Sequence, residues 1–206
     1  MNEPPQWNTD GDTLTMRTGP KTDFWCRTMQ DVMSPQEFAE KDLEPPEFLV
    51  DTGHFYYEVV KGDFTLTAQV GGDYNYQYDQ VGLYIRQDAD TWLKACVEVV
   101  YGSWSPRYTY SNPAHIVACT HTVDGWSGWS PLPESENNPP TVWFRVTRSG
   151  DTFFVDYSET GERWDLIKVF SMPGADELMV GVYATSPNGF GFDARIEHFS
   201  LVGDPS

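Results

Sequence analysis

The sequence predicts an all-β protein built as a two-sheet antiparallel sandwich. Roughly eleven short segments either alternate apolar and polar residues or are continuously apolar, as half-buried and fully buried strands are. Turn-forming pairs such as Gly-Asp, Gly-Gly and Pro-Gly separate these segments. Short strands at this spacing are typical of sandwiches, and one sandwich domain often reaches the 206 residues found here.

The expected strands cover residues 12–17, 55–60, 63–70, 80–87, 91–101, 115–121, 141–148, 152–158, 164–170, 178–185 and 190–201. One stretch breaks the strand pattern, because Ser34, Pro35 and Glu37 form a helix-capping sequence, which predicts a short helix near residues 35–42. The polar, proline-rich residues 127–140 are expected to form a loop. No repeat or linker divides the chain, so residues 1–206 are expected to form a single domain.

Charge and composition limit the partners. The net charge is -18, which disfavours nucleic acid and anionic membranes as partners, and no apolar run is long enough to span a bilayer. The 8 Trp exceed what a core of this size needs, so some are expected to line a ligand groove. Cys26, Cys96 and Cys119 are odd in number and no secretory signal follows Met1, which together predict a cytoplasmic location.

Several strands have an unusual polar face. Val81, Leu83 and Ile85 alternate with Gln80 and Arg86, so the apolar residues face one way and an amide and a guanidinium face the other. The same alternation exposes further aromatic and charged side chains, namely Asp23, Trp25, Arg27, Lys94, Glu98, Trp143, Arg145 and Tyr183. Gathered on one sheet, rings and hydrogen-bonding groups of this kind suit a sugar. The alternative is an ordinary solvated outer face.

Five segments carry a resemblance to a known family: TDFWCRT (22–28), YDQVGLYIRQDADTWLKACVE (78–98), GWSGWS (125–130), RSGDTFFVDYSETGERW (148–164) and VGVYATSPNGFGFDARIEHFSL (180–201). Together with Trp7 they resemble the DUF1349 family of regulation-of-enolase-like proteins. That resemblance implies a jelly-roll sandwich of the concanavalin A-like lectin/glucanase type, with ligands lying across a concave sheet. The family commonly has SDWS where this chain has SGWS, so no role of that Asp transfers to Gly128.

The resemblance and the polar faces together define a candidate ligand site. Its members are Asp23, Trp25, Arg27, Gln80, Arg86, Lys94, Glu98, Trp129, Arg145 and Tyr183. Residues 81–86 and 92–100 are expected to form a hairpin that brings Arg86 close to Lys94. Two neighbouring cations need an anion, which comes either from Glu98 and Asp23 in an internal network or from an acidic or phosphorylated sugar.

Catalysis is the alternative to binding. Glucanases of this fold use an E-x-D-x-E strand, and residues 40–44 match it literally, but they fall at a predicted helix end where the carboxylates do not share a face. Glu98 is therefore the candidate catalytic residue, with Asp23, Asp156 or Glu159 as the possible partner carboxylate. No cofactor fingerprint is present. Although acidic turns around Asp73 could hold calcium, no metal-ligand spacing predicts a metal site.

The sequence thus favours a lectin-like module that binds a sugar or sugar-derived small molecule and regulates carbohydrate metabolism. A glycoside hydrolase or lyase that uses Glu98 with Arg86 and Lys94 is the alternative. A protein partner docking on the aromatic surface is a third possibility.

Overall fold

The described chain folds into antiparallel β-sheets. The computed structural model describes residues 2–28, 49–105, 108–132 and 139–203. Within these ranges there are strands and no helix, so none is long and apolar enough to cross a membrane. The predicted helix near residues 35–42 and the E-x-D-x-E match at 40–44 lie outside the described residues.

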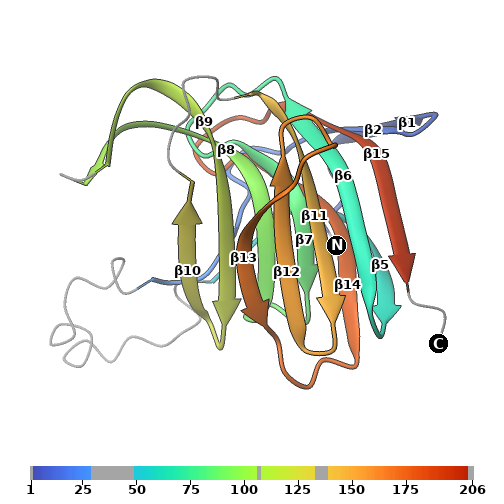
Figure 1. Ribbon diagram of the computed structural model, residues 1–206. Helices are drawn as coiled ribbons and strands as arrows, with labels where there is room; N and C mark the ends of the chain where they lie inside the picture. Colours follow the sequence, from blue (N-terminus) through green and yellow to red (C-terminus); the bar gives the residue numbers. More distant parts are fainter. Residues whose placement is uncertain (1, 29–48, 106–107, 133–138, 204–206) are drawn as a thin grey trace, which may run out of the picture.

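Two large sheets form the layers of a sandwich (Figure 1). The seven-stranded sheet has the order β1-β2-β15-β6-β11-β12-β13. Its strands are β1 (Gln6–Asp10), β2 (Thr13–Arg17), β15 (Asp193–Gly203), β6 (Phe64–Gly72), β11 (Thr141–Ser149), β12 (Thr152–Ser158) and β13 (Asp165–Ser171). The predicted two-sheet antiparallel sandwich is confirmed. The boundaries of six strands in this sheet fall within a few residues of the predicted ones, whereas the edge strand β1 was not predicted.

The six-stranded sheet has the order β10-β9-β8-β7-β14-β5. Its strands are β10 (Trp126–Pro131), β9 (Tyr108–Val123), β8 (Trp92–Ser105), β7 (Gln80–Arg86), β14 (Glu177–Thr185) and β5 (His54–Lys61). The β7–β8 hairpin is as predicted, with Ile85 opposite Leu93. The loop expected over residues 127–140 is wrong at its start, because residues up to Pro131 form the edge strand β10. Proline is tolerated on an edge strand, where a backbone N–H need not pair.

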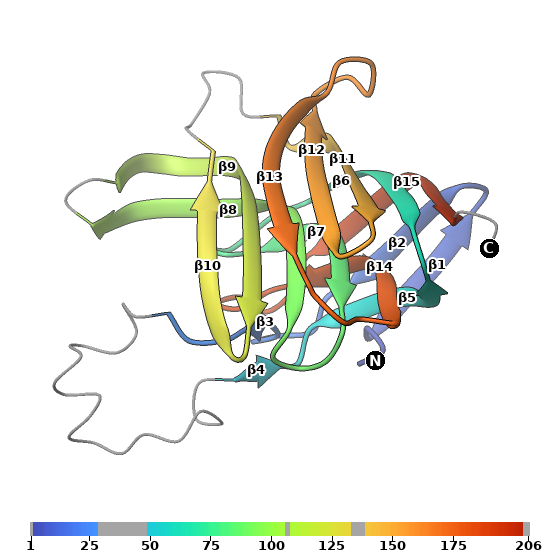
Figure 2. The same cartoon turned by 60° about the horizontal axis from the view of Figure 1, so that its bottom comes forward.

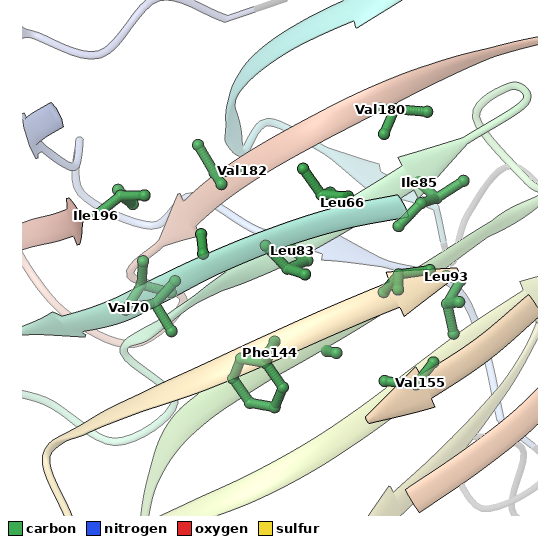
Figure 3. Close-up of a cluster of buried hydrophobic side chains, with 14 of the residues drawn as sticks. Leu66, Val70, Leu83, Ile85, Leu93, Phe144, Val155, Val180, Val182 and Ile196 are labelled. Atoms are coloured by element: carbon green, nitrogen blue, oxygen red, sulfur yellow. The ribbon is translucent and has the colours of Figure 1, made fainter. Parts of the chain in front are cut away.

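The alternating aliphatic residues fill the space between the sheets (Figure 3). Leu83, Ile85 and Val182 of the six-stranded sheet meet Leu66 and Phe144 of the seven-stranded sheet, and all five side chains are fully buried. Apolar area removed from water stabilises a fold by about 25 cal/mol per Å², so this core is the main source of stability. It also fixes which side chains of each strand face away from it.

A small third sheet lies against the six-stranded sheet on the side away from the core (Figure 2). It consists of β3 (Phe24–Trp25) paired with β4 (Val50–Asp51). Both strands are only two residues long, and neither was among the predicted strands. Their position decides how much of the outer face of the six-stranded sheet, opposite the core, is accessible to a ligand.

Candidate functional site

The polar face, meaning the face of the six-stranded sheet opposite the core, carries most of the predicted site. Gln80 pairs directly with Glu98, and Thr185 of β14 pairs with Gln80. Directly opposed residues point to the same face, and so do residues two apart on a strand. Gln80, Arg86, Lys94, Glu98 and Tyr183 therefore share this face, as the alternation predicted.

A second hydrophobic cluster lies along the polar face, and Tyr78 and Trp129 pack against it as partly buried rings. The Phe24 ring stacks on Tyr84, with centroids 4.6 Å apart and planes at 24°, and packs edge-on against Phe55 and Tyr183. Trp92 completes the cluster against Tyr84. The face is consequently not an open shelf along its length, because β3 closes the part nearest β14 and β5.

Arg86 lies under this cover and is bound within the protein. Its two terminal nitrogens donate to the two carboxylate oxygens of Asp51, at 2.6 and 2.9 Å. Only 7% of the Arg86 side chain is exposed. An internal ion network is therefore present: Asp51, which was not predicted, pairs with Arg86, and the predicted Asp23 pairs with Lys94.

Lys94 is held in the same way. Its ammonium donates to the carbonyl oxygen of Phe24 at 2.8 Å and lies 3.7 Å from Asp23 Oδ1. The ring of Trp25 lies 5.8 Å from the Lys94 nitrogen, within cation–π range. Burial raises the pKa of Asp23, an effect larger than the lowering by Lys94.

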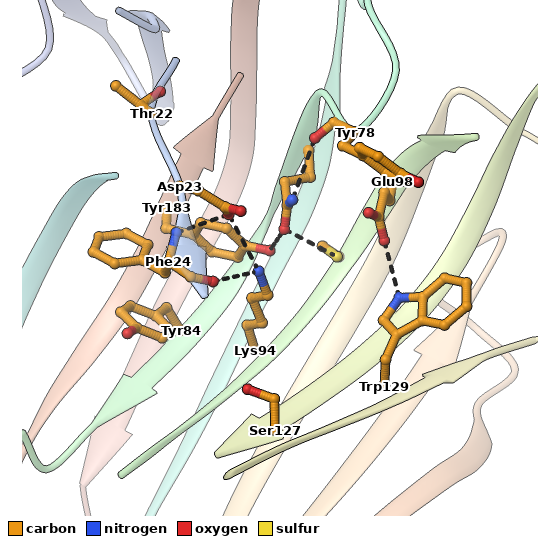
Figure 4. A network of polar contacts seen from close by, with 12 residues as sticks. Thr22, Asp23, Phe24, Tyr78, Tyr84, Lys94, Glu98, Ser127, Trp129 and Tyr183 are labelled. Atoms are coloured by element: carbon orange, nitrogen blue, oxygen red, sulfur yellow. Dashed lines mark hydrogen bonds and ion pairs between the residues drawn. The ribbon is translucent and has the colours of Figure 1, made fainter. Parts of the chain in front are cut away.

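Gln80 is fixed by both ends of its amide (Figure 4). The Tyr183 hydroxyl donates to Gln80 Oε1 at 2.7 Å, and Gln80 Nε2 donates to the carbonyl oxygen of Tyr78 at 3.2 Å. Since all of these groups are satisfied within the chain, Gln80 and Tyr183 form the floor of the site.

Glu98 lies on the polar face away from β3 and is itself buried. Figure 4 shows it between Tyr78 and Trp129, both of which are half-buried. The indole nitrogen of Trp129 donates to Glu98 Oε2 at 3.1 Å. Burial raises the pKa of Glu98 to about 7, against the lowering by Lys94 and by the hydrogen bond from Trp129, and Asp23 raises it further.

Two predicted site residues lie elsewhere. Arg145 is on β11 of the seven-stranded sheet, where it pairs with Asp156 at 2.8 Å and lies 4.4 Å from the ring centre of Trp164. Its placement in the shared site is wrong because alternation identifies the face of a strand but not the sheet to which the strand belongs. Arg27 lies by the edge strand β10, its guanidinium 4.1 Å from the ring centre of Trp126.

Two of the three carboxylates proposed as partners of Glu98 belong to the other sheet. Asp156 and Glu159 belong to the seven-stranded sheet and its turns. Asp23 is the remaining carboxylate beside the Lys94–Glu98 stretch, and it raises the pKa of Glu98 electrostatically. In the described part of the chain, no three His, Cys, Asp or Glu side chains are grouped as a metal site would require.

Comparison with known proteins identifies the family. Residues 1–203 match the family described as "Protein of unknown function (DUF1349)". The chain belongs to the DUF1349 family. Regulation of enolase protein 1 of Saccharomyces cerevisiae is 27% identical over 202 residues, covering 98% of this chain and 87% of the yeast protein.

Solved structures share the fold of this chain. A functionally unknown protein from Saccharomyces cerevisiae aligns at 26% identity and a TM-score of 0.80, over 100% of this chain and 96% of the other. The carbohydrate-binding module CBM66 from Bacillus subtilis aligns at 10% identity and a TM-score of 0.54, over 96% and 91% of the two chains. The GH43 protein BlXynB from Bacillus licheniformis aligns at 13% identity and a TM-score of 0.58, over 98% of this chain and 36% of the other. At these identities the bacterial structures share the sandwich fold with the DUF1349 chain.

Proposed function

We propose that this DUF1349 protein is a non-catalytic, lectin-like module that binds a sugar or sugar-derived metabolite at the Glu98 end of the polar face. The observation that carries the proposal is the position of Glu98, which lies between the half-buried rings of Tyr78 and Trp129 and accepts the indole hydrogen bond. Aromatic rings pack against the C–H faces of sugars, and a carboxylate accepts from their hydroxyls.

The charges of the site favour a neutral sugar. Arg86 is bound to Asp51, and Lys94 is bound to Phe24 and Asp23, so neither cation needs an anion from a ligand. An acidic or phosphorylated sugar would meet Glu98 and Asp23 without a compensating positive charge, and like charges in a buried site repel strongly. Uronates and sugar phosphates are therefore expected to bind more weakly than neutral sugars.

The relatives support a role in carbohydrate metabolism. One is named as a regulator of enolase, and the sandwich fold is shared with a carbohydrate-binding module and a GH43 protein. We accordingly propose a regulatory module of residues 1–206 that acts as one domain in the cytoplasm. Cell fractionation with an antibody against the chain tests the location.

A thermal-shift and calorimetric screen of neutral mono- and oligosaccharides, uronates and sugar phosphates tests the binding proposal. Neutral sugars are expected to stabilise the wild type, and W129A is expected to abolish the effect. W7A is the matched control, because Trp7 is 51% exposed on β1 of the other sheet. A wild type that responds to no sugar contradicts the proposal, and so does a W129A variant that still binds normally.

A carbohydrate-active enzyme is the second candidate. The observation that favours it is the pKa of Glu98 of about 7, which suits a general acid at neutral pH, with Asp23 as the neighbouring carboxyl. Release of a chromophore from aryl glycosides by the wild type, and its loss in E98Q, would establish this activity. Sugar binding without turnover would exclude it for the sugars tested.

A further inference from the structure

Two basic side chains lie close together where the edge strand β10 of one sheet meets the edge strand β13 of the other. Lys168 of β13 lies 3.5 Å from the Ser130 hydroxyl of β10. The ring of His121, on the neighbouring strand β9, packs against Phe170 of β13 with centroids 4.9 Å apart. Figure 1 shows β13 beside β9 and β10, so the two sheet edges meet here.

Lys168 points inward from its edge strand. It pairs with Val155, which is fully buried in the core, and directly opposed residues share a face. In the described chain, six lysines and arginines form ion pairs with carboxylates, but Lys168 is not among them. Burial lowers the pKa of Lys168, which the Cys119 thiol offsets in part.

His121 has one ring nitrogen without a partner, while the ring also forms a hydrogen bond with the Gly128 backbone. Its Nδ1 is buried and has no hydrogen-bond partner within the described structure. The His121 ring fills the space that a side chain at position 128 would need, because a Cβ added to Gly128 would come 2.5 Å from His121 Cε1. Burial and then the charge of Lys168 lower the pKa of His121, against a smaller raising by the Gly128 backbone.

We propose that Lys168 and His121 form a binding site for a small oxyanion, a carboxylate or a phosphate group, that is separate from the sugar site. One ligand oxygen would accept from the Lys168 ammonium and another from a protonated His121 Nδ1, with the Ser130 hydroxyl as a third donor. The groups facing this pair are the Cys119 thiol on β9, the Gly128 backbone and Ser130 on β10, and Phe170 on β13. No carboxylate within ion-pair distance competes for Lys168 in the described ranges.

Binding takes up one proton. His121 is mostly neutral when the site is empty, because burial and Lys168 disfavour its charged form. An anion at the site favours the charged form, so Nδ1 acquires a proton from solvent as the ligand binds. Affinity is consequently expected to rise as the pH falls toward 6, until the ligand itself begins to protonate.

Histidine-ring NMR on the full chain tests the site, with sodium phosphate and sodium acetate as probes and sodium chloride to match ionic strength. The His121 signals are expected to shift saturably and its pKa to rise, while His115 on the same strand stays unchanged. K168Q is expected to bind at least about tenfold more weakly, as loss of a charged hydrogen bond implies. K61Q is the control of equal charge, because Lys61 pairs with Glu177 and lies on β5, at the edge of the six-stranded sheet away from β10.

The two probes separate the ligand classes: a response to acetate alone assigns the site to carboxylates, and a response to phosphate alone assigns it to phosphorylated ligands. An unmoved His121 in the wild type overturns the proposal, even if K168Q proves insoluble. An equal response in K168Q also overturns it. Lys168 would then serve only as an inward-pointing charge that keeps the edge strand from pairing with other chains.

Discussion

Trp129 donates its indole hydrogen bond to Glu98 across an intervening strand. Trp129 is on β10 and Glu98 on β8, with β9 between them, and the two atoms are 3.1 Å apart. The indole therefore lies over the polar face and fixes the buried carboxylate of Glu98. This contact ties the edge of the sheet to the proposed sugar site.

Replacing Trp129 with Phe tests that contact. W129F keeps a ring but removes the donor, so the buried Glu98 carboxylate loses its hydrogen bond and its pKa is expected to rise further. Hydrogen bonds to charged groups contribute about 1.5–3 kcal/mol, and we expect a loss of that order in the free energy of unfolding at pH 8. Urea denaturation measures the loss, with W7F as the control. An unchanged free energy at pH 8 would contradict the role of the contact.

The raised pKa of Glu98 makes stability depend on pH. The ordinary pKa is 4.5 and the folded value is about 7, so the unfolded chain releases the proton more easily. The contribution of Glu98 therefore lowers the free energy of unfolding as the pH rises from 4.5 through 7, by about 3 kcal/mol at most. E98Q removes this penalty, and its stability relative to wild type is expected to increase between pH 5 and pH 8. A constant difference across that range, measured by chemical denaturation, would show that Glu98 is not perturbed.

The Arg86–Asp51 pair is expected to hold β4 against the sheet. Removing one partner of a fully buried pair costs about 3–5 kcal/mol. Asp51 is a quarter exposed, so its removal, which leaves the Arg86 charge unpaired, is expected to fall at the lower end of that range. D51N is therefore expected to lower the melting temperature clearly. E177Q, which breaks the exposed pair with Lys61, serves as the control and is expected to have little effect. Equal behaviour of the two variants would refute the structural role of Asp51.

Phe24 covers the polar face, and its removal is expected to open it. F24A deletes a ring that is 1% exposed and stacks on Tyr84, at a cost of about 3 kcal/mol. The same variant should make Lys94 more reactive toward amine-labelling reagents, because loss of the ring loosens β3, whose residue-24 carbonyl holds the ammonium, and Lys94 is 2% exposed in the native protein. Mass spectrometry of labelled peptides checks this. Protection of Lys94 in folded F24A would contradict the covering role.

The sequence predicted the sandwich and the face of each strand because aliphatic side chains recur with a period of two. It correctly grouped Lys94 with Glu98, which lie on one strand. It misplaced Arg145 because an identical alternation occurs in both sheets, and only strand order distinguishes them. It missed Asp51 because Asp51 lies on the two-residue strand β4, which meets Arg86 of β7 only in the folded chain and leaves no periodic signal.

The edge strand β10 shows a second limit of prediction from the sequence. Its sequence, WSGWSP, contains turn-forming residues, and it was predicted as part of a loop. It forms a strand because β9 offers a long partner and because an edge position tolerates both Gly128 and Pro131. Trp129 was included in the predicted site by family resemblance, whereas its contact with Glu98 follows only from the order of strands.

The indole N–H signal of Trp129 offers the most direct test of the central claim, that a sugar binds between Tyr78 and Trp129 over Glu98. Comparing spectra of wild type and W129F assigns this signal among those of the 8 Trp. Titration with the neutral sugar that gives the largest thermal shift should move the Trp129 signal saturably and leave that of Trp7 in place. A sugar that stabilises the protein without moving the Trp129 signal would contradict the account.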